Sequence, residues 1–201
     1  MPGLALLALL PSTGRAQQGR NFRDAWFWGA KAGNMTYWTR MERHAQAPLI
    51  GGEWLITRSR GGLYLSLDQA VFTGKTLLPG YTDAAYQIDF KDMRRFTAAG
   101  FFFPGQVLHF RPYGGIGFAL NFIQQAKWAD PSIDADISAY QNRASPIIIA
   151  GGQFQLMRFS VFGQGSYMPA QDRFLLNNNE TYFVEAGIRW NIGSSIDRPG
   201  R

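Results

Sequence analysis

Histidine, serine and acidic side chains are the residues of this 201-residue chain that could carry acid-base or nucleophilic chemistry. The chain contains two histidines, His44 and His109, and no cysteine. A serine nucleophile needs a base within hydrogen-bond reach. Ser66 and Asp68 are close in the sequence, but neither has a histidine neighbour. We therefore expect no catalytic residues and no enzymatic activity.

Metal and cofactor chemistry is also absent from the sequence pattern. No histidine, cysteine or carboxylate spacing matches a metal site, and there is neither a phosphate loop nor a dinucleotide fingerprint. His44 lies beside Arg40 and Arg43, and this basic group could face lipid phosphates. The formal charge is +6. Because the bases are scattered along the chain, we expect anionic lipid head groups rather than nucleic acid as the partner.

The elements that must position these side chains are strands. In residues 182–192 every second residue is apolar, while Glu185, Arg189 and Asn191 lie between them. Successive side chains of a strand point to opposite faces, so this run has one apolar and one charged face. In a soluble protein the apolar face would meet a core, and in a membrane barrel it would meet lipid.

Seven further runs have a similar pattern, and no stretch of 18 apolar residues predicts a transmembrane helix. We predict an all-β fold, an eight-stranded antiparallel up-and-down transmembrane β-barrel, with a bulge or break around residues 92–94. The expected strands are residues 25–38, 49–57, 62–72, 84–103, 110–122, 146–156, 159–167 and 182–192.

Connection lengths separate the membrane barrel from a soluble sandwich. Residues 58–61, 104–109 and 157–158 form short connections, and each alternates with a longer one. Outer-membrane barrels sort their connections in this way, with short turns on the periplasmic side and long loops outside. A soluble lipocalin-like barrel that binds an apolar ligand is the main alternative fold.

Aromatic residues on the expected outward face gather near the strand ends. Such rings favour the boundary between membrane and water, so two aromatic girdles are predicted. The predicted interface residues are Trp26, Trp28, Trp38, Trp54, Tyr86, Phe110, Phe159, Tyr167, Tyr182 and Trp190.

Basic and acidic residues are nearly equal in number on the expected inward face. An eight-stranded barrel is only wide enough for side chains to fill it, and buried charges are tolerated when they are paired. We therefore predict a salt-bridged, plugged lumen rather than a selectivity filter, which would carry one dominant sign. The predicted structural charge network is Lys31, Glu53, Asp68, Asp89, Lys91, Arg95, Arg111, Glu185 and Arg189.

The first sixteen residues have the features of a secretory signal peptide. Residues 3–10 (GLALLALL) are apolar, and small residues Gly14 and Ala16 occupy the two positions that a signal peptidase reads. We expect residues 1–16 to be a cleaved signal peptide and residues 17–201 to form one outer-membrane β-barrel domain. A buried N-terminal helix is the alternative.

Three short segments resemble the small eight-stranded outer-membrane barrels of the OmpA/OmpW type in Gram-negative bacteria. These are residues 111–118 (RPYGGIGF), 51–54 (GGEW) and 187–190 (GIRW). The resemblance covers most of the mature chain but indicates no chemical activity. It implies an outer-membrane location, outer-membrane lipids as partners, and recognition of Trp190 in the final strand by the barrel-assembly machinery.

Two functional alternatives to a structural or surface-interaction role remain. OmpW-like relatives are associated with passage of small hydrophobic solutes, which the inward Phe101, Phe103, Ile147 and Ile149 would suit. Some small barrels modify membrane lipids, although this chain lacks a histidine placed to activate a serine. Residues 124–145 could form a receptor or adhesion loop, with acidic residues that could bind a divalent cation weakly.

Overall fold

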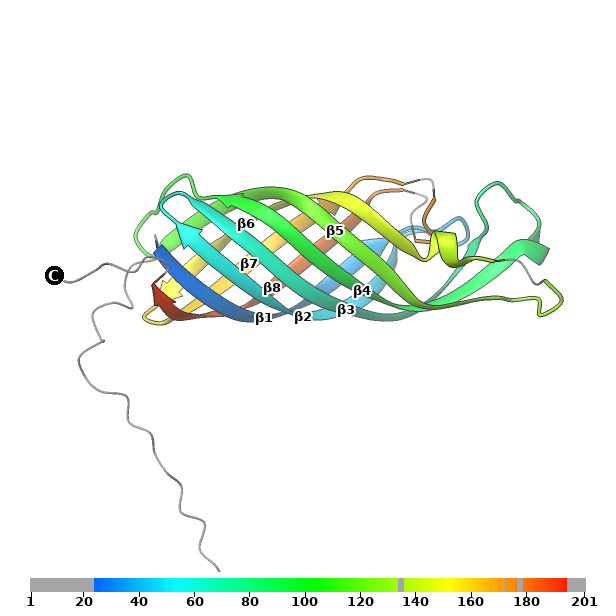
Figure 1. The fold of residues 1–201 in the computed structure, drawn as a ribbon, viewed down its shortest axis with the longest axis horizontal. Coiled ribbons are helices and arrows are strands. Elements are labelled where there is room, and N and C mark those ends of the chain that lie inside the picture. Colours follow the sequence, from blue (N-terminus) through cyan, green and yellow to red (C-terminus); the bar gives the residue numbers. More distant parts are fainter. Residues whose placement is uncertain (1–23, 134–135, 172, 177–178, 195–201) are drawn as a thin grey trace, which may run out of the picture.

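The computed structural model is a single closed barrel in which each strand pairs with the next and β1 pairs with β8 (Figure 1). The structure describes residues 24–133, 136–171, 173–176 and 179–194. The predicted signal peptide, residues 1–16, lies outside this part of the chain. The elements are β1 (Asp24–Tyr37), β2 (Ala45–Arg58), β3 (Gly61–Leu77), the 3-10 helix η3 (Ala84–Tyr86), β4 (Gln87–Phe102), β5 (Phe110–Trp128), the 3-10 helix η4 (Ser138–Tyr140), β6 (Asn142–Leu156), β7 (Phe159–Met168) and β8 (Thr181–Ser194).

The antiparallel eight-stranded barrel predicted from the alternating pattern is confirmed. All eight strand pairs are antiparallel. Turns of two residues join β2 to β3 and β6 to β7, and twelve residues join β7 to β8. The connection from β4 to β5, predicted to be short, has seven residues, as many as the connection from β1 to β2. Within the described residues no helix is both long and apolar enough to cross a membrane.

Most strands extend further toward the long loops than the sequence predicted. β2 begins at Ala45, β3 ends at Leu77 and β5 ends at Trp128. In these extensions the outward side chains are polar, as at Lys75, so hydrophobic alternation does not reveal the strand. The connection predicted at residues 124–145 is consequently reduced to residues 129–141.

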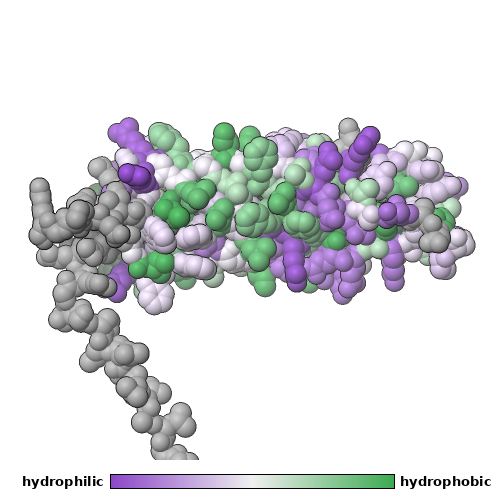
Figure 2. Space-filling model, viewed as in Figure 1, coloured by the Kyte–Doolittle hydropathy of each residue, from purple (hydrophilic) through white to green (hydrophobic). Residues whose placement is uncertain are grey.

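Apolar side chains cover the outside of the barrel over the half nearer the short turns. Figure 2 shows this hydrophobic surface, with hydrophilic side chains gathered beyond it toward the long loops. Ile116 and Val184, for example, are 72% and 70% exposed. Burying such side chains in lipid is favourable at about 25 cal/mol per Å², so the outward face fits a membrane environment.

The predicted irregularity near residues 92–94 is confirmed. Asp92 has a φ of 54°, and the register between β3 and β4 shifts between Ala70 and Thr73. The Asp92 carboxylate accepts a hydrogen bond from the Phe72 backbone amide at 3.1 Å. The inward phase of β4 changes here, because Phe90 before Asp92 and Met93 after it are both buried.

Candidate functional site

The inside of the barrel holds a cluster of charged side chains that are shielded from solvent. Lys31 Nζ lies 3.0 Å from Asp68 Oδ1 and 2.9 Å from Glu185 Oε1. Arg95 Nη2 lies 2.8 Å from Asp68 Oδ2 and 2.6 Å from Glu185 Oε1. Each base therefore contacts both acids, and these four side chains come from β1, β3, β4 and β8.

A second ion pair joins β8 to β2. Arg189 Nε donates to Glu53 Oε1, and Arg189 Nη1 donates to Gln153 Oε1 at 2.7 Å. Arg189 is completely buried. Its guanidinium carbon lies 3.8 Å from the centre of the Phe162 ring, which gives a favourable cation-π contact.

Neutral polar side chains connect the two ionic groups. Gln164 Nε2 donates to Glu185 Oε2 at 2.8 Å and to the Tyr64 hydroxyl at 3.2 Å. The Tyr113 hydroxyl donates to Gln164 Oε1 at 3.0 Å. The resulting group, called the central network here, comprises Lys31, Glu53, Tyr64, Asp68, Arg95, Tyr113, Gln153, Gln164, Glu185 and Arg189.

Every strand of the barrel supplies at least one member of the central network. Its formal charges balance, because Lys31, Arg95 and Arg189 are matched by three carboxylates. Isolated charges at this depth would carry a large desolvation cost, which ion pairing and hydrogen bonds offset. The arrangement ties all eight strands together through side chains.

The structure brings together six of the nine charged residues predicted for the lumen. These are Lys31, Glu53, Asp68, Arg95, Glu185 and Arg189. Arg111 is buried as predicted, but it lies toward the short turns, where Nη2 donates to the Ser59 carbonyl at 3.0 Å. Its guanidinium carbon also lies 4.1 Å from the centre of the Phe103 ring.

The prediction that Asp89 and Lys91 point into the lumen is wrong. They precede Asp92, where the strand changes phase, so Ile88 and Phe90 take the buried positions instead. Lys91 is exposed, and Asp89 is half-buried and accepts a hydrogen bond from Gln87 at 2.9 Å.

The central network also contains four uncharged residues that the predicted charge network did not include, Tyr64, Tyr113, Gln153 and Gln164. Their type gave no charge signal. The strand alternation places them on the same inward face as the charged residues. Because a buried amide or hydroxyl needs a hydrogen-bond partner, this placement could have indicated that they bond to those charges.

Aromatic side chains cluster on the outside near both ends of the apolar surface. Trp28 stacks on Trp54 with ring centres 6.0 Å apart, and Trp26 meets Trp54 edge-on at 5.6 Å. Phe159 lies 5.5 Å from Trp190. Phe110 is also exposed on the outward face. These residues lie toward the short turns, as predicted, and their interfacial role remains a prediction.

A second aromatic cluster lies toward the long loops. The Tyr182 ring is 5.5 Å from that of Tyr167 and 5.8 Å from that of Trp38. Tyr86, in contrast, is not on the outward face of a strand. It belongs to η3 and packs on Tyr81 at 4.1 Å, because β4 begins only after it.

The residues considered for nucleophilic catalysis are not assembled. Ser66 Oγ donates to Asp68 Oδ2 at 3.1 Å inside the barrel. His44 lies in the connection from β1 to β2, and His109 lies at the opposite end, in the connection from β4 to β5. In the described part of the chain, no group of three or more histidines, cysteines and carboxylates could hold a metal ion.

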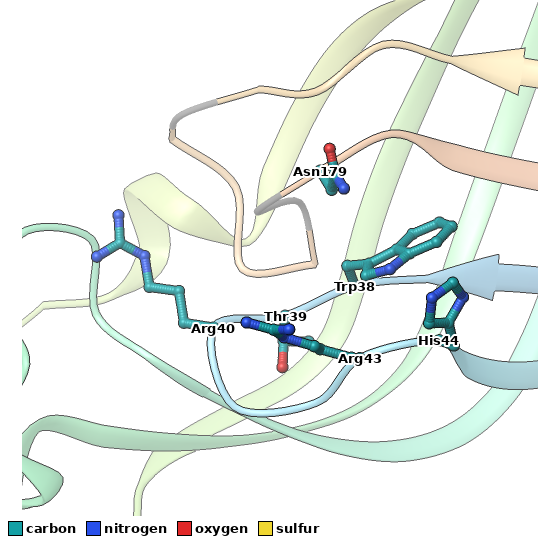
Figure 3. A pocket seen from close by; sticks show the side chains of 6 residues that line it. All are labelled: Trp38, Thr39, Arg40, Arg43, His44 and Asn179. Carbon is teal, nitrogen blue, oxygen red and sulfur yellow. The ribbon is translucent and has the colours of Figure 1, made fainter.

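A cavity of about 380 Å³ lies between the connection from β1 to β2 and the segment leading into β8 (Figure 3). Its described lining residues are Trp38, Thr39, Arg40, Arg43, His44 and Asn179. From the sequence, Arg40, Arg43 and His44 were expected to be able to face lipid phosphates. In the structure all three line this cavity.

No known family model matches the sequence. No curated protein matches it either. Solved structures, however, share its fold. Neisserial surface protein A has a TM-score of 0.60 at 12% identity, and the match covers 83% of this chain and 97% of that protein.

Two proteins of Pseudomonas aeruginosa are similar in the same way. The N-terminal β-barrel domain of OprF matches with a TM-score of 0.50 at 17% identity, covering 83% of this chain and 97% of that one. The outer membrane protein OprG matches with a TM-score of 0.50 at 12% identity, covering 86% and 98%. The closed barrel and these likenesses confirm the predicted fold: the chain is a small eight-stranded antiparallel β-barrel that shares the fold of these outer-membrane proteins.

Proposed function

We propose that the chain is a non-conducting outer-membrane barrel that holds its long loops at the cell surface, in a structural or surface-interaction role. The central network carries this proposal. It spans the barrel interior, and all of its charged side chains are at most 5% exposed. An ion crossing the lumen would have to displace paired charges from a low-dielectric interior, where their attraction is strongest.

Apolar side chains on both sides of the central network support a closed lumen. Toward the short turns, Phe101 stacks on Tyr64 and Tyr113 with ring centres 4.6 and 5.0 Å away. Phe103 lies beside them at 6.3 Å from Phe101. These rings occupy the interior that a path for hydrophobic solutes would need, so they favour a packed interior over transport.

The loop end is also packed. Ile137, Phe174, Leu175 and Leu176 belong to the connections after β5 and β7, yet they are buried with strand residues in one apolar cluster. The Leu175 amide donates to the Tyr140 carbonyl at 3.2 Å, which joins the two connections. Ile147 and Ile149 are buried in the same cluster, so they fit an interior packing role.

Solute flux in reconstituted liposomes tests the closed lumen. The folded barrel is inserted into phosphatidylcholine liposomes, and efflux of potassium and entry of an apolar dye are compared with protein-free liposomes. We expect both rates to be unchanged. A protein-dependent potassium flux would contradict the proposal in favour of an ion channel, and protein-dependent entry of the dye alone would favour hydrophobic transport.

A charge-neutral pair of substitutions provides the matched comparison. Arg95→Ala with Glu185→Ala removes one base and one acid from the central network, and we expect it to raise the potassium flux. Asp89→Ala with Lys91→Ala makes the same change in net charge outside the network. This control should leave the flux at the protein-free level.

A further inference from the structure

We propose that the cavity beside Trp38 binds a phosphate group, either on a lipid head group or as free inorganic phosphate. Three of its six described lining residues are basic, Arg40, Arg43 and His44, and none is acidic (Figure 3). The cavity volume of about 380 Å³ lies within the range of roughly 300–1,000 Å³ typical of small-molecule sites. This inference is independent of the closed lumen.

The two guanidinium groups are available to a ligand. Within the described residues, neither Arg40 nor Arg43 forms an ion pair with a carboxylate. The arginines inside the barrel differ, since Arg95 and Arg189 have carboxylate partners. Guanidinium groups recognise phosphate through pairs of parallel hydrogen bonds, so unpaired arginines at one cavity favour an anionic ligand.

The loop that carries these bases is held in one conformation by Thr39. The buried Thr39 hydroxyl donates to the Lys75 carbonyl at 2.7 Å and accepts from the Met41 and Glu42 amides at 3.2 and 2.8 Å. The Thr39 amide donates to the Glu42 carbonyl at 2.8 Å. A loop fixed in this way loses less conformational entropy on binding than a free one.

The cavity adjoins the aromatic cluster at the loop end of the barrel. Trp38 lines the cavity, and its ring lies 4.9 Å from that of His44 and 5.8 Å from that of Tyr182. Tyr182 is exposed on the outward face, where such rings favour the membrane boundary. The position therefore suits a phosphate on a neighbouring lipid, and the exposed Arg40 and Arg43 also suit a phosphate from solution.

Two probes distinguish the sources of the phosphate group. Inorganic phosphate is titrated into the folded full barrel in a zwitterionic detergent and followed by calorimetry. Separately, the barrel is taken from nanodiscs of phosphatidylcholine with phosphatidic acid, and the retained lipids are counted by native mass spectrometry. Saturable binding of inorganic phosphate supports a site open to solution, and selective retention of phosphatidic acid supports a lipid site.

The double substitution Arg40→Gln and Arg43→Gln tests the assignment to this cavity. Loss of two charged hydrogen-bonding groups should weaken binding by about tenfold or more. Arg58→Gln with Arg60→Gln removes the same charge at the opposite end and should leave binding unchanged. If the double variant does not fold, Arg43→Gln alone gives the comparison. Absence of binding by both probes, or binding unaffected at Arg40 and Arg43, would overturn the proposal.

Discussion

At the scale of single residues, Glu185 contacts two buried bases of the central network, Lys31 and Arg95. It accepts from Lys31 and Arg95 through one carboxylate oxygen and from Gln164 through the other. Its removal would leave two buried bases to share Asp68. The sequence could identify Glu185 as inward, because it alternates with apolar residues, but the identity of its partners depends on how strands distant in sequence close the barrel.

Glu185→Gln is expected to lower the free energy of unfolding by about 3 kcal/mol, since it leaves buried positive charge without its partner. Urea titration of the barrel in phospholipid vesicles, followed by tryptophan fluorescence, measures this change. Glu180→Gln is the control, because Glu180 lies outside the network and, among the described residues, accepts only a weak hydrogen bond from the Tyr182 hydroxyl at 3.4 Å. Equal midpoints for the two variants would contradict the role given to Glu185.

At the scale of elements, hydrophobic alternation predicted all eight strands, but not the phase of β4 on both sides of Asp92. Asp92 has a left-handed backbone conformation, which exchanges the inward and outward faces of the strand at this point. The order of polar and apolar residues in the sequence does not reveal this exchange. Asp89 and Lys91 therefore seemed to share the inward face of Arg95. The polar extensions of β3 and β5 were not predicted either. They lie beyond the apolar surface of the barrel, where outward side chains need not be apolar, so hydrophobic alternation does not mark them as strand.

Asp92→Val should destabilise the barrel by about 1–2 kcal/mol, because a β-branched residue is strained at a φ of 54° and the hydrogen bond to Phe72 is lost. Asp92→Asn keeps both a side-chain acceptor and tolerance of this conformation, so it should behave like the unsubstituted protein. Urea midpoints of the two variants provide the comparison. A fully stable Asp92→Val protein would show that the strand irregularity does not depend on this residue.

Close pairing of β4 and β5 depends on a glycine that faces inward. A Cβ at Gly117 would lie 2.1 Å from the Ala98 carbonyl oxygen and 2.5 Å from the Ala99 Cα. Gly117→Ala should therefore cost roughly 1–3 kcal/mol through overpacking. Gly100→Ala, where a Cβ would meet nothing within 4 Å, should be neutral. The yield of folded barrel in detergent and its urea midpoint measure both, and equal loss in the two variants would contradict the packing argument.

At the scale of the whole molecule, a closed barrel of paired strands should resist dodecyl sulfate until it is heated. Its backbone hydrogen bonds are satisfied around the full circumference, which leaves no strand edge to open. An unheated sample should run faster on a gel than a boiled one, and the protein should fractionate with the outer membrane. A soluble protein without a gel shift would indicate the lipocalin-like alternative.

Electrical conductance across a planar phospholipid bilayer tests the closed lumen most directly. All eight strands place side chains in the central network, and apolar residues pack on both sides of it. The inserted, folded barrel is therefore expected to show no sustained ionic current above that of the protein-free bilayer, over a range of applied potentials. Steady current steps from the unsubstituted protein, abolished by heat denaturation before insertion, would contradict this account.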